Sequence, residues 1–195
     1  VLVLGTGIGG GIILNGKVLM GAHAAAGEVS GLVSNMAAME TETFEMNKVE
    51  TFSDAPLWAG AASATGLIRE YARQKKLSLQ GPLPTGEEIF AAYNAGEPEA
   101  QKALKIFARR VAVGILSLQH VLDVEKVAIG GGISKQPILV ETLNEVYEEY
   151  ILRGHPFSEA QARCLPRPEI VPCRFLSEAN QIGAFASYQK AFLEN

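Results

Sequence analysis

A run of glycines near the start of the chain constrains the fold more than any other feature. Gly5–Gly11 reads Gly-Thr-Gly-Ile-Gly-Gly-Gly and follows the apolar stretch Val1–Leu4, which predicts a buried strand. Because glycine has no Cβ, such a segment can turn sharply and let another group approach its backbone N–H groups. The run therefore indicates either a phosphate-binding loop or a glycine-rich hairpin turn.

The residues after the glycines decide between two kinds of loop. The spacing Gly5-x-Gly7-x-x-Gly10 also matches the dinucleotide-binding pattern, which needs a helix directly after the glycines. Here Asn15-Gly16 separates two apolar runs, and this dipeptide is a strong hairpin signal. We therefore expect the glycines to join two strands, with a third strand after the hairpin, and we reject a dehydrogenase.

These glycines and four later motifs resemble the C-terminal half of the ROK proteins, a family of sugar kinases and repressors. In chain order the later motifs are Asn15-Gly16-Lys17, Gly21-Ala22-His23, Ala26-Gly27-Glu28-Val29 and Ala128-Ile129-Gly130-Gly131-Gly132-Ile133-Ser134. The resemblance spans most of the chain. It implies an α/β protein with the ribonuclease H-like fold of actin-like ATPases, a mixed sheet with helical insertions.

The expected order of elements agrees with that fold. Periodicity indicates helices and strands in the order helix 55–76, helix 85–94, helix 98–122, strand 125–129, helix 136–152, strand 169–172 and helix 180–193. Thr85 and Glu88 form a capping-box signature. We expect helix 98–122 to be buried on both sides. The helices of 55–96 form an insertion that lines the active-site side or an oligomer contact, and 36–54 shows little periodicity.

The chain lacks an initiator Met and starts inside an expected strand, so we expect it to be a piece of a longer protein. The resemblance implies that a separate N-terminal half carries the catalytic aspartate and a second phosphate loop. Residues 1–195 then form one C-terminal actin-like ATPase domain. On their own, these residues are expected not to phosphorylate a substrate.

The two glycine motifs form the candidate nucleotide site. The resemblance implies that the phosphates of ATP are held by Thr6 and the backbone of Gly5, Gly7, Gly9 and Gly10. The second motif follows a strand, where α/β sheets bind ligands. By resemblance, adenosine contacts Gly131, Gly132 and Ser134. The alternative for this second motif is a tight strand–helix connection. Mg²⁺ would be held mainly by phosphates and water.

The candidate sugar site is the Ala-Gly-Glu motif. A carboxylate can accept hydrogen bonds from two neighbouring hydroxyls, and by resemblance Glu28 holds the hexose ring, with Gly27 and His23 beside it. The alternative is an ordinary surface glutamate. The family's usual Gly-Glu-x-Gly-His ends in Gly31 here, and its cysteine-rich zinc loop is absent from the sequence. We therefore expect no zinc and no metal ligands in this chain.

Leu57-Trp58 stands where the family often has another acidic sugar ligand. Trp58 either stacks on a sugar or aglycone or belongs to the core, and we favour the core. These departures resemble the zinc-less branch of the family, with members similar to β-glucoside kinase and N-acetylmannosamine kinase rather than a plain glucokinase.

Composition and charge limit the classes of binding partner that we expect for this chain. The net charge is −4 without a long basic block, and no apolar run is long enough to span a bilayer, so we expect neither nucleic-acid nor membrane binding. The isolated Cys164 and Cys173 are typical of a reducing cytoplasm. The last helix has an apolar face formed by Ile182, Phe185, Tyr188, Phe192 and Leu193. We expect that face to be exposed and covered by self-association into a homo-oligomer.

Together these observations predict the ATP-binding domain of a cytoplasmic sugar kinase, which transfers the γ-phosphoryl group of ATP to a hydroxyl of a hexose or glycoside. Two alternatives stay open: the sugar-sensing domain of a ROK repressor, and a non-catalytic actin-like module used in assembly.

Overall fold

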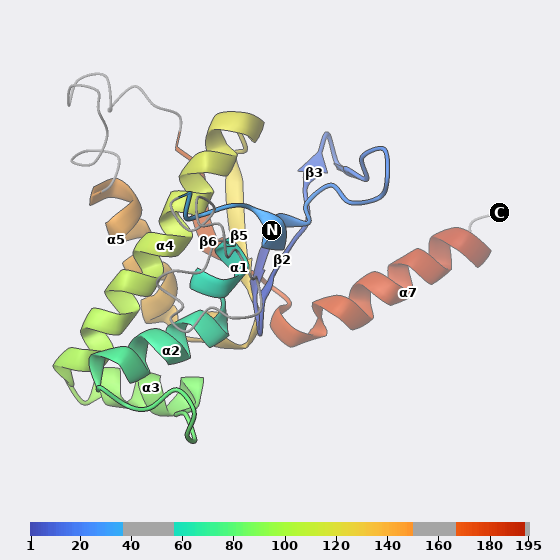
Figure 1. Ribbon diagram of the computed structural model, residues 1–195. Helices are drawn as coiled ribbons and strands as arrows, with labels where there is room; N and C mark the ends of the chain where they lie inside the picture. Colours follow the sequence, from blue (N-terminus) through green and yellow to red (C-terminus); the bar gives the residue numbers. More distant parts are fainter. Residues whose placement is uncertain (37–56, 150–166, 194–195) are drawn as a thin grey trace.

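The computed structural model of the protein describes residues 1–36, 57–149 and 167–193 (Figure 1). Its centre is a four-stranded sheet of order β2-β1-β5-β6, and helices cover one face of this sheet. Only β2 runs antiparallel to its neighbour, so the sheet is mixed. The predicted α/β class is confirmed. The polar stretch 36–54 and the expected zinc-loop position lie almost entirely outside the described residues.

The chain begins with two short hairpins. Strands β1 (Leu2–Leu4) and β2 (Ile8–Gly10) pair around the first glycine motif, as predicted. The next two strands, β3 (Ile13–Leu14) and β4 (Lys17–Val18), form a separate two-stranded ribbon, so the expected second strand is split into β2 and β3. Asn15 and Gly16 both have positive φ, 52° and 74°, as a type I′ turn requires.

The predicted helix 55–76 is wrong in one respect, since the described part of it forms two helices. They are α1 (Trp58–Ala61) and α2 (Ala64–Gln74). Ser63 separates them because its side chain is fully buried and accepts a hydrogen bond from the Gly66 N–H, which caps α2. Residues 55 and 56 lie outside the described part of the chain.

The next helices follow the sequence closely. The capping box of Thr85 and Glu88 starts α3 (Gly86–Asn94), and α4 (Pro98–Leu122) has the predicted bounds. One side of α4 faces the sheet, α2 and α5, and its side chains Phe107, Val111 and Ile115 are completely buried. The expectation that α4 is buried on both sides is wrong, because its remaining face is exposed from Gln101 and Lys102 to His120 and Val121.

The second half of the sheet is built from parallel strands. Strand β5 (Lys126–Gly130) leads through the 3-10 helix η4 (Gly132–Lys135) to α5 (Pro137–Glu149), which packs on α4. Strand β6 (Glu169–Pro172) then lies parallel to β5. In the described ranges, no helix combines the length and hydropathy needed to cross a bilayer.

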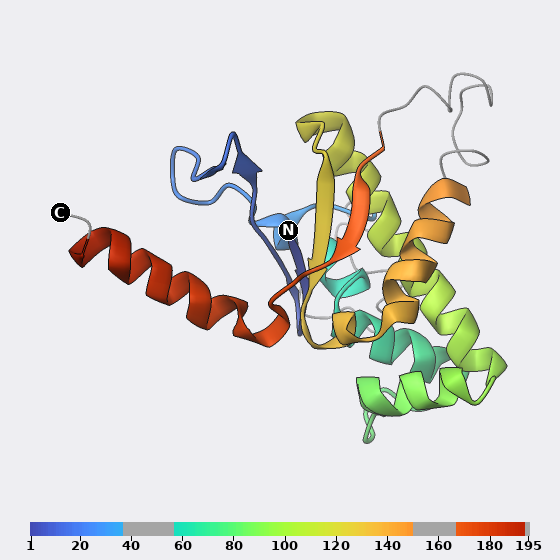
Figure 2. The same cartoon turned by 180° about the vertical axis from the view of Figure 1, so that it is seen from behind.

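The chain ends in a helix that leaves the body of the molecule. After η6 (Leu176–Glu178), helix α7 (Ala179–Phe192) extends away from the sheet and from the other helices (Figures 1 and 2). The predicted apolar face is exposed: the five side chains are between 43% and 69% accessible. The partner that covers this face stays a prediction.

Candidate functional site

The two glycine loops meet at one edge of the sheet. Strands β1 and β5 are parallel, so the turn after Leu4 and the loop after Gly130 leave from the same edge, where open α/β sheets bind ligands. Gly131 has φ of 97°, and a Cβ built on it would lie 2.2 Å from the Leu4 carbonyl oxygen. The backbones of the two predicted nucleotide-binding motifs are therefore in direct contact.

Two helices of the predicted insertion border these loops. The Ala64 N–H, at the start of α2, donates a hydrogen bond to the Gly5 carbonyl (2.8 Å). At the start of α3, a Cβ on Gly86 would lie 3.5 Å from the Ile133 side chain, next to the second loop. The partial positive charge of a helix N-terminus favours anions. The insertion therefore lies on the side of the molecule that carries the candidate site.

Some of the glycines are not required by packing inside the chain. A Cβ on Gly7 or on Gly132 would meet no atom within 4 Å, and neither residue has a positive φ. Both are exposed, as is Thr6 at the tip of the first turn. The Gly5 N–H donates to the Gly7 carbonyl (3.0 Å), which holds this turn in shape. The open sides of these residues leave room for a ligand to approach the backbone.

Gly9 and Gly10 lie beyond the turn, on β2. A Cβ on Gly10 would lie 2.4 Å from the Gly27 carbonyl oxygen, so Gly10 is required by close packing with the Ala-Gly-Glu motif. A Cβ on Gly9 would point toward the Val3 side chain. The contact of Gly9 and Gly10 with phosphate stays a prediction. For Gly10, packing against Gly27 is a sufficient reason for a glycine at this position, even without a ligand.

Ser134 acts on the second loop from inside the protein. Its side chain is buried, and its hydroxyl donates a hydrogen bond to the Gly131 carbonyl (2.8 Å). The Ser134 N–H donates to the same oxygen (3.2 Å). In this structure Ser134 therefore fixes the loop conformation, and direct contact with adenosine stays a prediction.

The candidate sugar residues lie at the other end of the first hairpin. Gly27 packs against Gly10, which is about 10 Å along the strand from Gly7 at a rise of ~3.3 Å per residue. Glu28 is exposed, and its Oε1 accepts hydrogen bonds from the Ser30 hydroxyl (2.5 Å) and the Ser30 N–H (3.4 Å). His23 is exposed on the loop before them. The structure therefore does not bring these residues to the glycine turn.

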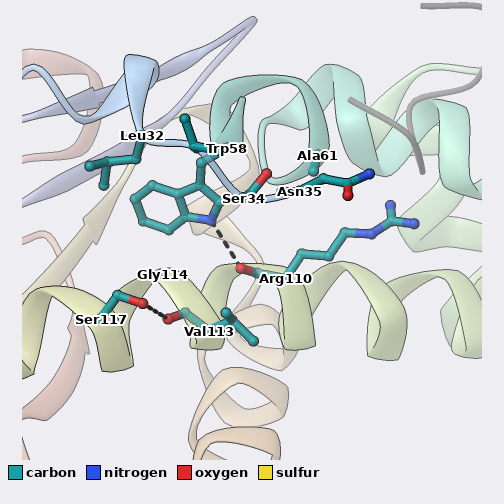
Figure 3. A pocket seen from close by; sticks show the side chains of 10 residues that line it. Leu32, Ser34, Asn35, Trp58, Ala61, Arg110, Val113, Gly114 and Ser117 are labelled. Atoms are coloured by element: carbon teal, nitrogen blue, oxygen red, sulfur yellow. Dashed lines mark hydrogen bonds between the residues drawn. The ribbon is translucent and has the colours of Figure 1, made fainter. Parts of the chain in front are cut away.

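Trp58 belongs to the core, as predicted. It is 2% exposed, and its indole N–H donates a hydrogen bond to the Arg110 carbonyl (2.9 Å; Figure 3). A Cβ on Gly114 would lie 2.1 Å from the indole ring, so the ring packs directly on the α4 backbone. In this arrangement Trp58 is not available to stack on a sugar.

A cavity of about 240 Å³ lies beside Trp58, between α1, α4 and the segment after the 3-10 helix η1 (Val29–Gly31; Figure 3). Its lining residues are Leu32, Val33, Ser34, Asn35, Trp58, Ala61, Arg110, Val113, Gly114 and Ser117. They come from three segments far apart in the sequence, so no local pattern could have predicted it. The cavity lies away from the glycine loops.

Sequence reasoning also missed a buried carboxylate that joins α2 to α4. The Glu70 side chain is 1% exposed and accepts hydrogen bonds from Arg73 (2.5 Å), Gln74 (2.6 Å) and Arg110 (2.7 Å). Burial raises the pKa of Glu70, but the hydrogen bonds from Arg73 and Gln74 and the charges of the two arginines outweigh burial, and the pKa is lowered. Arg110 is thus a partner of a buried charge rather than part of a solvated helix face.

No His, Cys, Asp or Glu side chains within residues 1–36, 57–149 and 167–193 gather in a group of three or more that could hold a metal ion. The donors on the glycine loops include backbone N–H groups and the Thr6 hydroxyl, and Lys135 ends the 3-10 helix that follows Gly131. Such a set fits the phosphates of a nucleotide, with Mg²⁺ bound through those phosphates.

Comparison with known proteins agrees with this architecture. The β-glucoside kinase of Listeria monocytogenes is 31% identical over 153 residues, which are 78% of this chain and 47% of that protein. The chain thus spans about half the length of the curated relatives it matches. The fold is also that of a ROK family glucokinase from Streptomyces griseus, solved in complex with glucose and AMPPNP (TM-score 0.70, 21% identity, 94% of this chain and 57% of that one).

The same fold occurs in a ROK family transcriptional regulator, a homologue of the E. coli MLC protein (TM-score 0.67, 22% identity, 94% of this chain and 43% of that one). Similarity at this level shows the fold alone. The sequence profile of the ROK family matches residues 1–191, nearly the whole chain. The chain therefore belongs to the ROK family.

Proposed function

We propose that this chain is the nucleotide-binding domain of a cytoplasmic, ATP-dependent sugar kinase. The sugar hydroxyl oxygen attacks the γ-phosphorus, ADP leaves, and the hydroxyl proton passes to an aspartate contributed by a longer protein. The single observation that carries the proposal is the backbone contact between Leu4 and Gly131, which unites the two glycine loops at one sheet edge. The sugar-kinase relatives support the reaction class.

Each part of the site has a role in this proposal. The turn Gly5–Gly7, with the Thr6 hydroxyl and the N-terminus of α2, faces the β- and γ-phosphates and stabilises charge that develops on them. Gly131 and Gly132 lie against the adenosine, and Ser134 holds their loop. When bound, Mg²⁺ neutralises the phosphate oxygens and is held through them.

The sugar is proposed to lie toward the Glu28 end of the hairpin. Glu28 is oriented by Ser30, and its second carboxylate oxygen can accept a hydrogen bond from a sugar hydroxyl. The phosphate chain then follows the hairpin from the turn toward Glu28, and the γ-phosphoryl group is its end nearest the sugar. Gly27 allows this close approach of the motif to β2.

Nucleotide binding by this chain tests the proposal directly. We expect calorimetry with ADP and Mg²⁺ to detect binding, and Gly7→Val and Gly132→Val to weaken it at least tenfold, because each side chain would fill space that now borders the site. Gly81→Val is the matched control, since Gly81 also lies in an exposed loop without tight contacts. Absence of binding, or equal effects of the three substitutions, would contradict the proposal.

A sugar-sensing domain is the second candidate, favoured by the fold shared with the regulator. A sensor needs the sugar residues but not the phosphate turn. Titration with a glucoside and with ADP separates the two: binding of sugar alone favours the sensor, and binding of ADP favours the kinase. If neither ligand binds, the remaining alternative is the non-catalytic assembly module.

A further inference from the structure

The segment that follows β6 leaves the sheet at the same edge as the two glycine loops. Strands β5 and β6 are parallel, with Ile129 opposite Pro172, and the Cys173 N–H donates a hydrogen bond to the Ile129 carbonyl (2.8 Å). A Cβ on Gly130 would lie 3.2 Å from the Cys173 sulfur. Residues 173–175, which connect β6 to η6, therefore start directly beside the second glycine loop.

The 3-10 helix η6 stays close to that loop. It contacts η4, the 3-10 helix that begins at Gly132, and Figure 2 shows the chain running from β6 past the end of β5 before it reaches α7. Leu176, the first residue of η6, has φ of 42°, a left-handed conformation that leucine rarely adopts. Strained turns of this kind are often found at ligand sites. Phe175, the residue before this turn, therefore lies near the second loop.

Phe175 presents an exposed aromatic ring at this place. The residue is 47% exposed, and the guanidinium carbon of Arg174 lies 5.5 Å from the centroid of its ring. That distance is within the range of a cation–π interaction, which restricts the orientation of the ring. An aromatic ring that is exposed and held in this way is a platform on which another planar group, such as a nucleic base, can stack.

The charged residues around this ring fit an anionic ligand better than an apolar protein surface. Arg174 precedes the ring and Lys135 ends η4; both are exposed, and no carboxylate in the described part of the chain forms an ion pair with either. Glu178 ends η6, and its N–H donates to the Phe175 carbonyl (2.9 Å). The two cations outnumber this carboxylate, so the surroundings of Phe175 attract a phosphorylated ligand.

We infer that Phe175, held by Arg174, stacks on the base of the bound nucleotide. The inference rests on the proposed nucleotide site and adds the side chain that binds the base. With the sugar at Glu28 and the phosphates at the Gly5–Gly7 turn, the base lies at the end of the site away from Glu28, where η4 and η6 meet. The open backbone of Gly132 then borders one side of the base, and the ring of Phe175 borders the other.

Calorimetry of the 195-residue chain with ADP and with tripolyphosphate tests the stacking. We expect Phe175→Ala to raise the dissociation constant of ADP at least ~5-fold and to leave that of tripolyphosphate unchanged, because tripolyphosphate has no base. Phe175→Tyr keeps an aromatic ring and should retain the affinity for ADP. Phe185→Ala is the matched control, since Phe185 is 61% exposed on α7 and follows the edge by a further ten residues. If the wild-type chain binds ADP and Phe175→Ala binds it equally well, the inference alone is overturned; if the wild-type chain binds no ADP, the proposed function fails and the inference with it.

Fluorescence tests the contact itself. The chain has a single tryptophan, Trp58, which is buried, so Phe175→Trp adds one exposed indole whose emission is measured against the wild-type chain. We expect saturating ADP to change the emission of that indole, because the base stacks on it, and saturating tripolyphosphate to leave it unchanged. Phe185→Trp is the matched control and should respond to neither ligand. An unchanged emission of Phe175→Trp when ADP is bound, or the same change with tripolyphosphate, overturns the inference.

Discussion

The carbonyl oxygen of Leu4 occupies the space in which any residue other than glycine at position 131 would place its Cβ atom. A Cβ at position 131 would be 2.2 Å from this oxygen and 2.7 Å from the carbonyl carbon. Backbone alone therefore joins the end of β1 to the loop after β5. Because the contact involves no side chain, it holds the two glycine loops at a fixed separation, and this pre-forms the candidate nucleotide site.

The contact predicts a loss of stability in Gly131→Ala. The positive φ of Gly131 and the clash with Leu4 should lower the free energy of unfolding by about 1–3 kcal/mol. Gly132→Ala is the matched control: its Cβ meets nothing within 4 Å, so the change should stay within ~0.5 kcal/mol. Urea unfolding followed by circular dichroism measures both, and similar losses in the two variants would contradict this account.

Local sequence signals predicted the elements whose causes are local. Asn15-Gly16 has the backbone angles that its dipeptide favours, and Thr85 with Glu88 forms both hydrogen bonds of the capping box. The break between α1 and α2 was missed because apolar residues keep a helical period through Ser63. Only the burial of Ser63 in the assembled fold lets its hydroxyl serve as a cap.

The sequence motifs name the candidate site residues, whose roles stay predictions, but the motifs do not show how these residues are arranged. The glycine motifs identify both loops, yet the sequence does not separate Gly7, which faces open space, from Gly10, which packs on Gly27. That distinction depends on which strands become neighbours. Glu28 was predicted from its motif, whereas its position at the far end of the hairpin follows from the course of β2.

Gly114→Ala should disturb the only tryptophan of the chain. The added methyl group would overlap the Trp58 ring, so overpacking should lower the free energy of unfolding by about 1–3 kcal/mol. The emission of Trp58 should also shift to longer wavelength as its ring is displaced toward water. Val121→Ala, on the same helix but 80% exposed and outside the cavity beside Trp58, should change neither, and a matching emission shift there would contradict the explanation.

The lowered pKa of Glu70 predicts that the folded protein loses stability in acid. Its pKa is lowered in the folded protein, so it stays ionised at pH values where the unfolded chain binds a proton. The stability that Glu70 contributes is present above its pKa in the unfolded chain, which is near 4.5, and is lost as the pH falls through the lower pKa of the folded protein. Glu70→Gln should therefore cost about 2 kcal/mol at pH 7 and progressively less below pH 4.5.

Urea midpoints measured from pH 7 to pH 3 test this dependence. Glu87→Gln, on the exposed side of α3, removes a carboxylate outside the Glu70 cluster and should leave the pH profile unchanged. If Glu70→Gln lowered the free energy of unfolding by the same amount over the whole pH range, the negative charge of Glu70 would not be what stabilises the contact between α2 and α4.

Ser134→Ala should weaken adenosine binding without weakening phosphate binding. Loss of the hydroxyl removes its bond to the Gly131 carbonyl, about 1 kcal/mol, and loosens the second loop but not the Gly5–Gly7 turn. Calorimetry should therefore show lower affinity for ATP and AMP and unchanged affinity for tripolyphosphate. Ser117→Ala removes an equivalent hydroxyl-to-backbone bond on α4 and should alter none of the three. If Ser134→Ala lowered the affinity for tripolyphosphate as much as the affinity for ATP, the two loops would not hold separate parts of the nucleotide.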